Sequence, residues 1–518
     1  MRTNNLLYIA IGLCLVFTSC SDFLDTMPDN RTEIDSENKV TSLLVSAYPK
    51  ITSAMMTEMA SDNAMDNSAQ FVVTNREQEQ AYLWQDITEV SNDSPTTFWE
   101  ACYSAIATAN LALESIDNMD NPDRLSAQRG EALICRAYAH FALANVFCLT
   151  YNPGNASNNL GLPYITSNDS EITSKHSRGT LAELYANINA DIEEALPLID
   201  DEIYTVPKYH FNRKAAHAFA ARFNLYYLNF DKVIEYADVV LGSNPAGMMK
   251  NWEEIALGSA SNWDVRVDMY IDAQEPANLL LLPVTSSWGY VVGGFYKNLG
   301  SRYAHSLEIC VGETGQADGL WGDYNGLLPF RALWGDEQKI SVAKIGGYFY
   351  YVDKVNGVGY RKNVILAFSA DETLLCRAEA HILKGEYELA TADINIWLES
   401  HTIIEDRVTT EQIVDFYDRI SSTPINNSSR TVKREIKPQG FTVTAGDQKE
   451  MIQCILHLRR IETIHEGLRW EDIKRYGIEF SHNRDGQPND ILRVDDPRRA
   501  IQLPYDVIAA GLQANPRN

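Results

Sequence analysis

The sequence predicts a mainly α-helical fold, in which tetratricopeptide-like helix pairs form a superhelix that carries a large irregular insertion of loops and short strands. Three observations predict it. Helical patterns follow one another over residues 37–245. Two segments, 220–241 and 375–396, resemble each other as repeated helix pairs do. Between them, residues 246–360 are rich in glycine and lose helical periodicity, which indicates loops and short strands.

The first helical region contains two well-marked helices. Residues 130–148 place apolar side chains at helical spacing on one face, namely Leu133, Ala137, Phe141, Ala144 and Phe147. Residues 180–199 repeat this pattern and begin at Thr180, with Glu183 three positions later, which is the spacing of a capping box. Both segments are therefore expected to be helices.

The two similar segments share small and aromatic residues at matching positions. Each carries an alanine, an aromatic residue nine positions later and a small or aliphatic residue three positions after that; these are Ala221, Phe230 and Val233, and Ala378, Tyr387 and Ala390. Small residues where two helices cross, followed by a short turn and an aromatic residue, are typical of a tetratricopeptide repeat. Such a unit cannot bury its apolar face alone, so several must stack. The second turn contains Gly385, whereas the first has no glycine.

The middle of the chain differs from both helical regions. Short apolar runs at 278–284 and 348–352 indicate strands or extended loops. Five of the nine tryptophans fall between 252 and 334. Because long insertions in compact domains are commonly functional, this part of the chain is where we look for a binding site.

The N-terminus indicates export. Arg2 is followed by an uncharged, largely apolar run over 6–17, which is too short to span a bilayer because a helix needs about 20 residues. This is the layout of a secretory signal peptide. Two small residues then lead to Cys20, as in a bacterial lipoprotein signal, although Phe17 stands where leucine is usual. We expect a signal peptide over 1–19 and acylation of Cys20; the alternative is an ordinary signal peptide with an incidental cysteine.

The mature chain, 20–518, is expected to form a single domain, with helical repeats at about 37–245 and 365–480 around the insertion at about 246–360. Six cysteines remain in it: Cys102, Cys135, Cys148, Cys310, Cys376 and Cys454. They show no CxxC motif and no paired spacing, and four lie in alanine-rich helical patterns. We therefore expect buried thiols rather than disulfides or a zinc site.

The charge balance excludes nucleic acid as a partner. The chain has 44 Lys and Arg against 70 Asp and Glu, a net charge of −26, and no basic cluster offsets the repulsion of phosphates. With 45% hydrophobic residues it can still bury an extensive core. After the signal no apolar run approaches membrane length, so we expect a soluble body tethered at one end.

Several segments match, in order, the motifs of one known family. They are CSDFLDTMPDN (20–30), FWEACYSAIATANLAL (98–113), GEALICRAYAHFAL (130–143), GLPYIT (161–166), RRIETIHEGLRWEDIKRYG (459–477) and LPYDVIAAGLQANPRN (503–518). Together they resemble the SusD/RagB outer-membrane lipoproteins of Bacteroidetes. The 459–477 segment is the most specific, through Glu462, Glu466, Gly467, Arg469, Asp472 and Arg475. Leu458, Thr463 and Tyr505 depart from the family pattern.

The resemblance implies a fold of four tetratricopeptide-like helix pairs that supports an irregular half. It also implies a role at the exterior face of the outer membrane: binding a nutrient polymer, usually a glycan, and delivering it to a SusC-like TonB-dependent transporter. It implies neither an enzyme nor a cofactor. Two alternatives stay open, namely a peptide as ligand and a surface glycoside hydrolase, since any pair among so many acids could lie at the carboxylate separation that a hydrolase needs.

A binding site for a sugar polymer needs flat apolar platforms for the sugar faces and amides or carboxylates for the hydroxyls. Residues 286–298 and 318–326 offer aromatic side chains among glycine, aspartate and asparagine. A second patch could come from 61–70 and 82–87. We predict the ligand-binding residues Trp288, Tyr290, Tyr296, Trp321, Tyr324 and Trp84. The alternative for each is a core aromatic that holds a loop in place.

The charged motif near the C-terminus invites a catalytic or metal-binding interpretation. A helix through 451–475 would put Glu462 and Glu466 one turn apart, with His465 beside them. A carboxylate-bridged metal site would need further ligands from other helices, and HExxH is not formed. The acidic run at 117–123 lacks the glycine and terminal glutamate of an EF-hand. We therefore predict an ion-pair network that holds this helix to its neighbours, with no metal and no catalytic residue.

Overall fold

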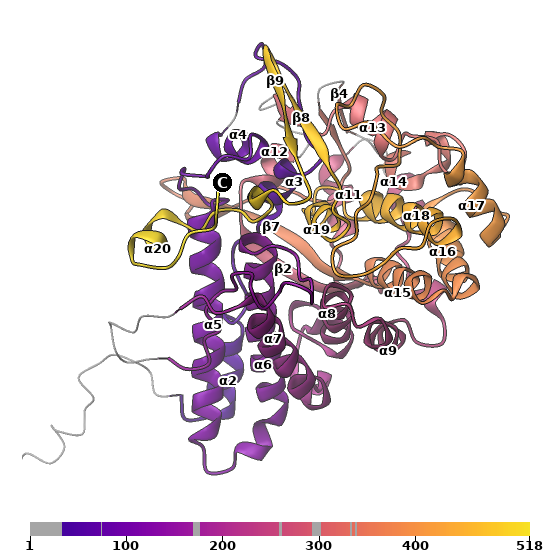
Figure 1. Ribbon diagram of the computed structural model, residues 1–518. Helices are drawn as coiled ribbons and strands as arrows, with labels where there is room; N and C mark the ends of the chain where they lie inside the picture. Colours follow the sequence, from indigo (N-terminus) through magenta and orange to yellow (C-terminus); the bar gives the residue numbers. More distant parts are fainter. Residues whose placement is uncertain are drawn as a thin grey trace, which may run out of the picture.

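The computed structural model describes residues 34–73, 75–168, 177–257, 262–292, 302–331, 334–336 and 339–517. The fold is mainly α-helical, as the sequence predicts, and Figure 1 shows the long N-terminal helices on one side of the molecule and the later helix pairs on the other. The signal peptide expected over 1–19 and the acylation expected at Cys20 lie outside the described residues.

Four helices form the N-terminal side (Figure 1): α2 (Glu37–Leu44), α5 (Pro95–Asp117), α6 (Ser126–Phe147) and α7 (Leu181–Ala195). Helix α6 confirms the helix predicted over 130–148. Helix α7 begins with the predicted capping box: the Thr180 hydroxyl accepts a hydrogen bond from the Glu183 backbone N–H at 3.2 Å, and the Glu183 carboxylate accepts one from the Thr180 N–H at 2.8 Å.

Two helix pairs contain the segments that resemble each other. They are α8 (Arg213–Tyr226) with α9 (Phe230–Leu241), and α15 (Ala370–Lys384) with α16 (Tyr387–His401). In the second pair, Gly385 ends α15 in the left-handed conformation, with φ of 80°. In the first pair Leu228 adopts the left-handed conformation, with φ of 65°. A non-glycine residue in this conformation carries roughly 1–3 kcal/mol of backbone strain. The same type of turn therefore forms in the first pair, but it is strained.

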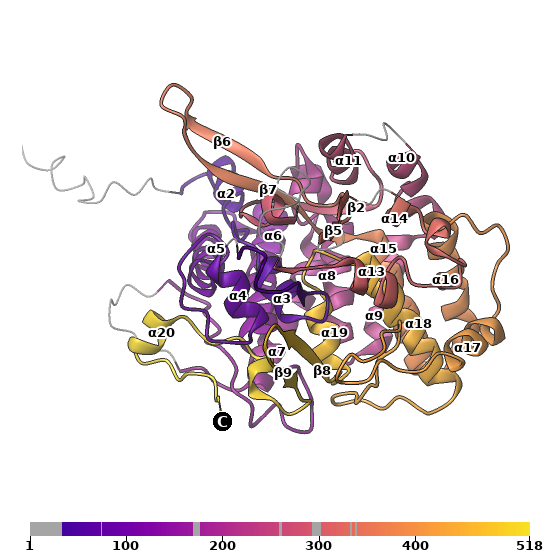
Figure 2. The ribbon, with the colours of Figure 1, turned by 90° about the horizontal axis from the view of Figure 1, so that it is seen from above.

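The central sheet has three antiparallel strands in the order β2–β7–β6: β2 (Asn278–Thr285), β7 (Val358–Ser369) and β6 (Tyr348–Asp353). Both apolar runs predicted as extended therefore form strands. Strand β2 is buried over most of its length, whereas β6 is an exposed edge strand. Figure 2 shows the hairpin of β6 and β7 projecting from the body of the molecule.

Shorter elements fill the space between the helices and the sheet. Before the insertion these are α3 (Ala54–Ala60), β1 (Met65–Asp66) and α4 (Arg76–Tyr82). Within it they are α10 (Trp252–Leu257), α11 (Trp263–Tyr270), α12 (Trp288–Val292), β3 (Tyr303–Ala304), α13 (Leu307–Glu313), α14 (Leu328–Arg331), β4 (Trp334–Asp336) and β5 (Lys339–Ser341). The last part adds β8 (Phe480–Arg484), β9 (Gln487–Leu492) and α20 (Tyr505–Ala509). Residues 246–360 thus contain short helices as well as strands.

The helix predicted through 451–475 is wrong in one respect, because the chain breaks in its middle. Helix α17 (Thr410–Asp418) precedes α18 (Asp447–Glu462), and α19 (Arg469–Arg475) follows after a turn. His465 and Gly467 in that turn have positive φ, 70° and 81°. A Cβ on Gly467 would lie 2.2 Å from the Thr57 hydroxyl, so a side chain there would collide with α3.

The cysteines of the core agree with the sequence prediction. The six cysteines of the described part are free and buried, as expected. Within the ranges given above, no helix combines the length and the apolar character needed to cross a membrane.

Candidate functional site

One of the segments predicted to bind ligand, 61–70, lies beside strand β3, which was not predicted to be part of the site. Strand β1 pairs antiparallel with β3, so that Met65 lies opposite Ala304 and Asp66 opposite Tyr303. The turn between β8 and β9, which contains Asp485, lies next to β1. We call the surface formed by Asp66–Ala69, Arg302 and Asp485 the junction surface.

The Asp66 carboxylate holds the junction surface together. It accepts hydrogen bonds from Arg302 Nε at 3.1 Å and from the backbone N–H of Asp485 at 3.1 Å. Asp485 in turn accepts one from the backbone N–H of Ala69 at 2.7 Å. Three segments that are far apart in the sequence are therefore fixed by one buried carboxylate, which is the rigidity that a binding surface needs.

Stacked aromatic rings lie beneath the junction surface. The Tyr82 ring stacks on Tyr303 at 4.6 Å and on His482 at 4.0 Å between ring centres, and the Trp84 ring stacks on His482 at 4.2 Å. The Trp84 indole N–H donates to the carbonyl of Ala60 at 2.8 Å, and only 7% of the residue is exposed. Trp84 thus supports the surface from below.

Trp288 and Trp321 are also core residues, with 2% and 4% exposure. The Trp288 indole N–H donates to the His465 carbonyl at 2.7 Å. The Trp321 ring packs against His457 at 5.2 Å. The prediction that the rings of Trp84, Trp288 and Trp321 are open platforms is therefore wrong: their faces are covered by other side chains, and a sugar ring cannot stack on them in this structure.

The other three predicted residues have different positions. Tyr290 is half-buried at the base of the β6–β7 hairpin, with the Arg361 guanidinium 4.8 Å from its ring centre. Tyr296 lies outside the described residues, and so does the side chain of Tyr324. Of the six predicted aromatic residues, Tyr290 is the one that the described structure leaves partly open.

Sequence reasoning missed Arg302 and Asp485. Asp485-Gly486 between two short extended runs is a typical hairpin signal, and Gly486 indeed has φ of 69°. That signal could have located the β8–β9 turn. Its pairing with Asp66 and Arg302 depends on the tertiary fold and has no local signature.

Two family models match separate parts of the chain. One, described as "Starch-binding associating with outer membrane", matches residues 22–225, and the other, described as "SusD family", matches residues 318–503. The chain belongs to the SusD/RagB family. A curated relative, "SusD-like protein P38" of Formosa agariphila, is 22% identical over 96% of this chain and 98% of the relative.

Solved structures of SusD/RagB proteins share the fold. A putative sugar binding protein from Bacteroides vulgatus is 17% identical, with a TM-score of 0.65 over 94% of this chain and 99% of that one. A SusD superfamily protein from Bacteroides thetaiotaomicron is 18% identical, with a TM-score of 0.61 over 93% and 99%. A structure described as "Laminarin binding SusD-like protein" is 15% identical, with a TM-score of 0.54 over 93% and 99%.

The most specific SusD/RagB segment, 459–477, forms a buried ion-pair network, as predicted. Asp62, next to α3, pairs with Arg434 Nε at 2.8 Å and with Arg469 Nε at 2.9 Å, and lies 3.5 Å from Arg460. Burial alone would raise the pKa of Asp62, but the guanidinium groups of Arg460 and Arg469 outweigh it and hold this pKa well below its usual range. The carboxylate is therefore charged.

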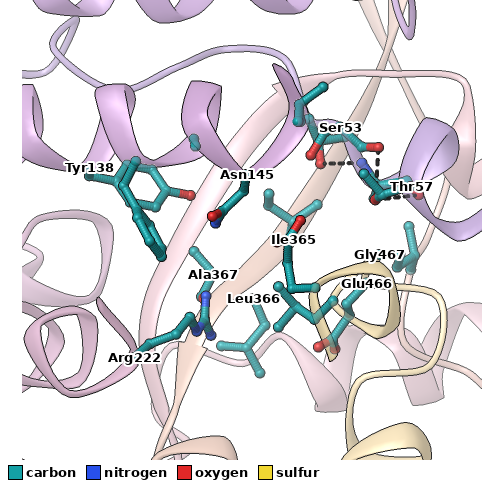
Figure 3. A pocket seen from close by; sticks show the side chains of 18 of the residues that line it. Ser53, Thr57, Tyr138, Asn145, Arg222, Ile365, Leu366, Ala367, Glu466 and Gly467 are labelled. Carbon is teal, nitrogen blue, oxygen red and sulfur yellow. Dashed lines mark hydrogen bonds between the residues drawn. The ribbon is translucent and has the colours of Figure 1, made fainter. Parts of the chain in front are cut away.

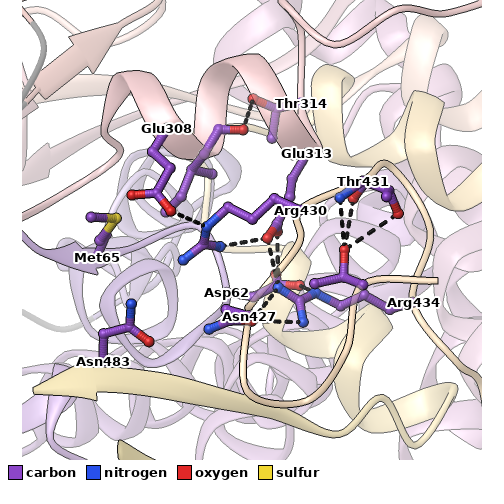
Figure 4. Close-up of polar contacts among 12 residues, drawn as sticks. Asp62, Met65, Glu308, Glu313, Thr314, Asn427, Arg430, Thr431, Arg434 and Asn483 are labelled. Carbon is purple, nitrogen blue, oxygen red and sulfur yellow. Dashed lines mark hydrogen bonds and ion pairs between the residues drawn. The ribbon is translucent and has the colours of Figure 1, made fainter. Parts of the chain in front are cut away.

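A second carboxylate, Glu313 on α13, completes this network. It pairs with Arg434 and Arg460 at 2.9 Å each, and with Arg430 (Figure 4). Burial would raise its pKa, yet Arg434 and Arg460 lower it to about 2. The network fastens α18 to the chain on both sides of the junction surface, because Asp62 leads into β1 and Glu313 follows β3.

A further buried group contains Asp371, His401 and Glu462, the residues of the described part that could hold a metal ion. His401 Nε2 lies 2.9 Å from the Glu462 carboxylate, and the Trp397 indole N–H donates to that carboxylate at 3.0 Å. The Lys250 backbone N–H donates to Asp371 at 3.0 Å. The His401–Glu462 ion pair and the donors Trp397 and Lys250 link the group into a buried polar network, which is how we interpret it.

A cavity of about 110 Å³ lies between α6, β7 and the turn before α19. Figure 3 shows Tyr138 and Asn145 of α6, Arg222 of α8 and Glu466 around it. Glu471 lines the same cavity, and burial raises its pKa to about 7 although Lys474, 3.0 Å away, lowers it.

This raised pKa predicts how stability depends on pH. A carboxyl that holds its proton more tightly when folded favours the native state at low pH, so stability should fall as pH rises from about 5 to 8. The Glu471 part amounts to about 3 kcal/mol at 1.36 kcal/mol per pKa unit. Urea unfolding across this range should show the slope, and Glu471→Gln should flatten it. The exposed control Glu254→Gln should keep the wild-type slope; equal slopes in all three proteins would contradict the assignment.

Proposed function

We propose that this chain binds a nutrient polymer, most directly an oligo- or polysaccharide, at the exterior face of the outer membrane and delivers it to a SusC-like TonB-dependent transporter. The family description names starch binding and the outer membrane, and one structural relative is described as binding laminarin. The observation that carries the proposal for this chain is the junction surface, where polar groups from three segments are held rigidly on an aromatic layer.

We propose that Arg302 and the 66–69 segment contact the sugar hydroxyls. Arg302 is half-buried, its guanidinium is oriented by Asp66, and it lies 5.1 Å from the Tyr303 ring centre. A fixed guanidinium can donate to two neighbouring hydroxyl oxygens at once, which favours a polyol over an apolar ligand. Tyr290, Tyr296 and Tyr324 remain the proposed stacking residues.

We further propose that binding occurs without cleavage. The two junction carboxylates, Asp66 and Asp485, are both occupied by backbone or arginine donors. A glycosidase needs one carboxyl that gives up a proton and a second that acts on the sugar or on water. A carboxylate fixed in an ion pair is poorly suited to donate a proton to the glycosidic oxygen. The junction surface therefore supports binding better than it supports hydrolysis. A peptide is the alternative ligand, since the same donors could bind its carbonyl oxygens.

The location and the partner rest on the N-terminal sequence and on the family. An acyl chain on Cys20 would tether the body to the outer membrane, and delivery into the cell then requires a separate channel. We propose that this channel is the SusC-like transporter, with the present protein covering it. An obligate interface of this kind buries more than about 2,000 Å² and should survive detergent.

Affinity electrophoresis tests the proposal directly. The protein should be retarded in gels that contain one or more polysaccharides from a panel including starch and laminarin, with no product after long incubation. Arg302→Ala should weaken retardation at least about ten-fold, because a charged hydrogen bond contributes about 1.5–3 kcal/mol and 1.4 kcal/mol is a factor of ten. Tyr296→Ala should also weaken it, by up to about ten-fold, because stacking on an aromatic ring adds about 0.5–1.5 kcal/mol beyond the burial of its area. The control Tyr505→Ala, an exposed tyrosine on α20, should behave as wild type.

Three outcomes would contradict the proposal. Released sugar or peptide products would make the protein an enzyme. Unchanged retardation in both variants would place the site away from the junction surface. Purification from solubilised membranes that repeatedly yields the protein without a barrel of the transporter class would remove the proposed partner.

A further inference from the structure

The β6–β7 hairpin exposes apolar side chains that no other described element covers. Its register places Tyr350 opposite Tyr360 and Tyr348 opposite Lys362. Strand β6 lies at the edge of the sheet, and the hairpin extends beyond the body of the molecule (Figure 2). Val355 at the tip is 94% exposed and Val352 beside it 67%. An exposed apolar edge strand is a liability unless something covers it.

The side chains change character in layers from the tip to the base. The exposed valines at 352, 355 and 358 lie nearest the tip, together with Asp353 and Lys354. The aromatic residues Phe349, Tyr350, Tyr351 and Tyr360 follow. Arg361 lies opposite Phe349 and Lys362 opposite Tyr348, and the Lys362 ammonium lies 4.9 Å from the Tyr350 ring centre. From Val352 to Tyr348 this sequence spans about 13 Å at the usual strand rise. Exposed valines nearest the tip, with aromatic rings and the cations Arg361 and Lys362 further towards the base, fit the arrangement of side chains at a membrane interface.

The carboxylate of the tip is paired with donors of the same turn. The Asp353 carboxylate accepts hydrogen bonds from the backbone N–H groups of Val355 and Asn356 at 2.8 and 3.1 Å, and from the Asn356 side-chain amide at 2.6 Å. Gly357 closes the turn with φ of 67°. Since unpaired polar groups are what makes a loop costly to remove from water, this turn is suited to a shallow position among lipid headgroups.

The charge of the hairpin is opposite to that of the chain. Residues 348–362 contain Lys354, Arg361 and Lys362 against the single acid Asp353, a local charge of +2 in a chain of −26. A cationic element is attracted to an anionic lipid surface, whereas the acidic body is repelled by it. The hairpin would therefore be the part of the protein that contacts the lipid.

We propose that the β6–β7 hairpin docks on an anionic lipid surface and provides a second membrane contact besides the acyl anchor. The inference rests on the proposed acylation of Cys20, which precedes the first described residue, Ile34, by 14 positions, so that the body stays within about 50 Å of the bilayer. Acyl attachment and a second weak contact together give durable membrane binding. A protein partner would be expected to cover the broad aromatic part, whereas here the most exposed apolar side chain is at the extreme tip.

Vesicle sedimentation tests the proposal with the full chain carrying Cys20→Ala, which cannot be acylated at that position. The protein should sediment with vesicles of phosphatidylcholine and phosphatidylglycerol, and less with phosphatidylcholine alone. Val355→Asp should reduce the bound fraction about ten-fold. Lys362→Glu should remove the preference for phosphatidylglycerol. The matched control Val90→Asp, whose valine is 68% exposed outside the hairpin, should bind as the parent does.

Glycan retardation and melting temperature of the same variants separate this inference from the proposed function. Both should be unchanged in Val355→Asp, because the side chain contacts solvent. No sedimentation of the parent protein, or equal losses in Val355→Asp and Val90→Asp, would overturn the membrane contact and leave glycan binding untouched. Normal sedimentation of Val355→Asp with lost glycan retardation would make the hairpin a glycan surface and would also overturn it. Normal sedimentation with lost transporter co-purification would show a protein contact instead.

Discussion

Replacing Asp62 with alanine should cost the protein about 3–5 kcal/mol of unfolding free energy, because removing one partner of a buried ion pair leaves uncompensated charge. Three guanidinium groups, those of Arg434, Arg460 and Arg469, would lose a carboxylate within 2.8 to 3.5 Å. Urea unfolding followed by circular dichroism measures the loss. The control is Glu399→Ala, which removes an ion pair with Arg407 of 2.6 Å whose side chains are exposed. Exposed pairs contribute at most about 1 kcal/mol.

The pH dependence of the same variant provides an independent check. The pKa of Asp62 is lowered in the folded protein. A lowered carboxyl pKa stabilises the native state above the unfolded value, near 4, and this stabilisation is lost as pH falls towards the folded value. Wild type should therefore lose stability below about pH 4 more steeply than Asp62→Ala. If the variant unfolds at the same urea concentration as Glu399→Ala, the network does not hold the junction together.

The parts of the fold that depend on local sequence could be predicted. The capping box at Thr180 and the apolar face of 130–148 involve residues within one or two helical turns, and both are present in the structure. The charged motif at 459–477 was predicted to form ion pairs because its acids and bases cannot be buried without partners. Which residues these charges pair with could not be predicted, because the partners are far away along the chain. Asp62 precedes the motif by several hundred residues and Glu313 by more than a hundred.

The aromatic residues show where local reasoning failed. Trp288 and Trp321 occur among glycine and polar residues, a composition that suggests an exposed loop. Their burial is decided by distant groups, namely the carbonyl of His465 and the ring of His457. The run at 348–352 forms the predicted strand, but its exposure was not predicted. Its consecutive apolar residues are typical of a buried strand, but β7 covers only one edge of β6, and both faces of the hairpin are left open.

The junction surface could be predicted from the sequence only in part. The sequence pointed to 286–298 and 318–326 as one source of ligand contacts and to 61–70 and 82–87 as a second patch. The pairing of β1 with β3 brings 61–70 next to Arg302, which lies in none of these segments. Strand pairing over more than two hundred residues depends on the whole fold, because only the packed helices and the Asp62–Glu313 network bring these segments within reach. Local sequence could thus nominate part of the site, while its assembly required tertiary structure.

Trp288→Ala is expected to lose about 3–5 kcal/mol of stability, the usual cost of truncating a buried tryptophan. The ring is 2% exposed, packs among Met59, Val291 and other apolar side chains, and its indole N–H bonds the His465 carbonyl. Trp288→Phe keeps most of the volume but leaves that carbonyl unpaired, so it should lose less. Urea midpoints of both variants, with the exposed Tyr505→Ala as control, measure this.

Ligand binding by the Trp288 variants shows whether this residue contributes only to stability or also contacts the ligand. At a temperature where Trp288→Phe is fully folded, glycan retardation should equal that of wild type, because the indole faces the interior and the proposed contacts belong to Arg302 and the tyrosines. Trp288→Ala should bind in proportion to its folded fraction. A variant that unfolds at the wild-type midpoint yet loses retardation would return Trp288 to the ligand-binding surface and would mean that the ring turns outward when a glycan binds.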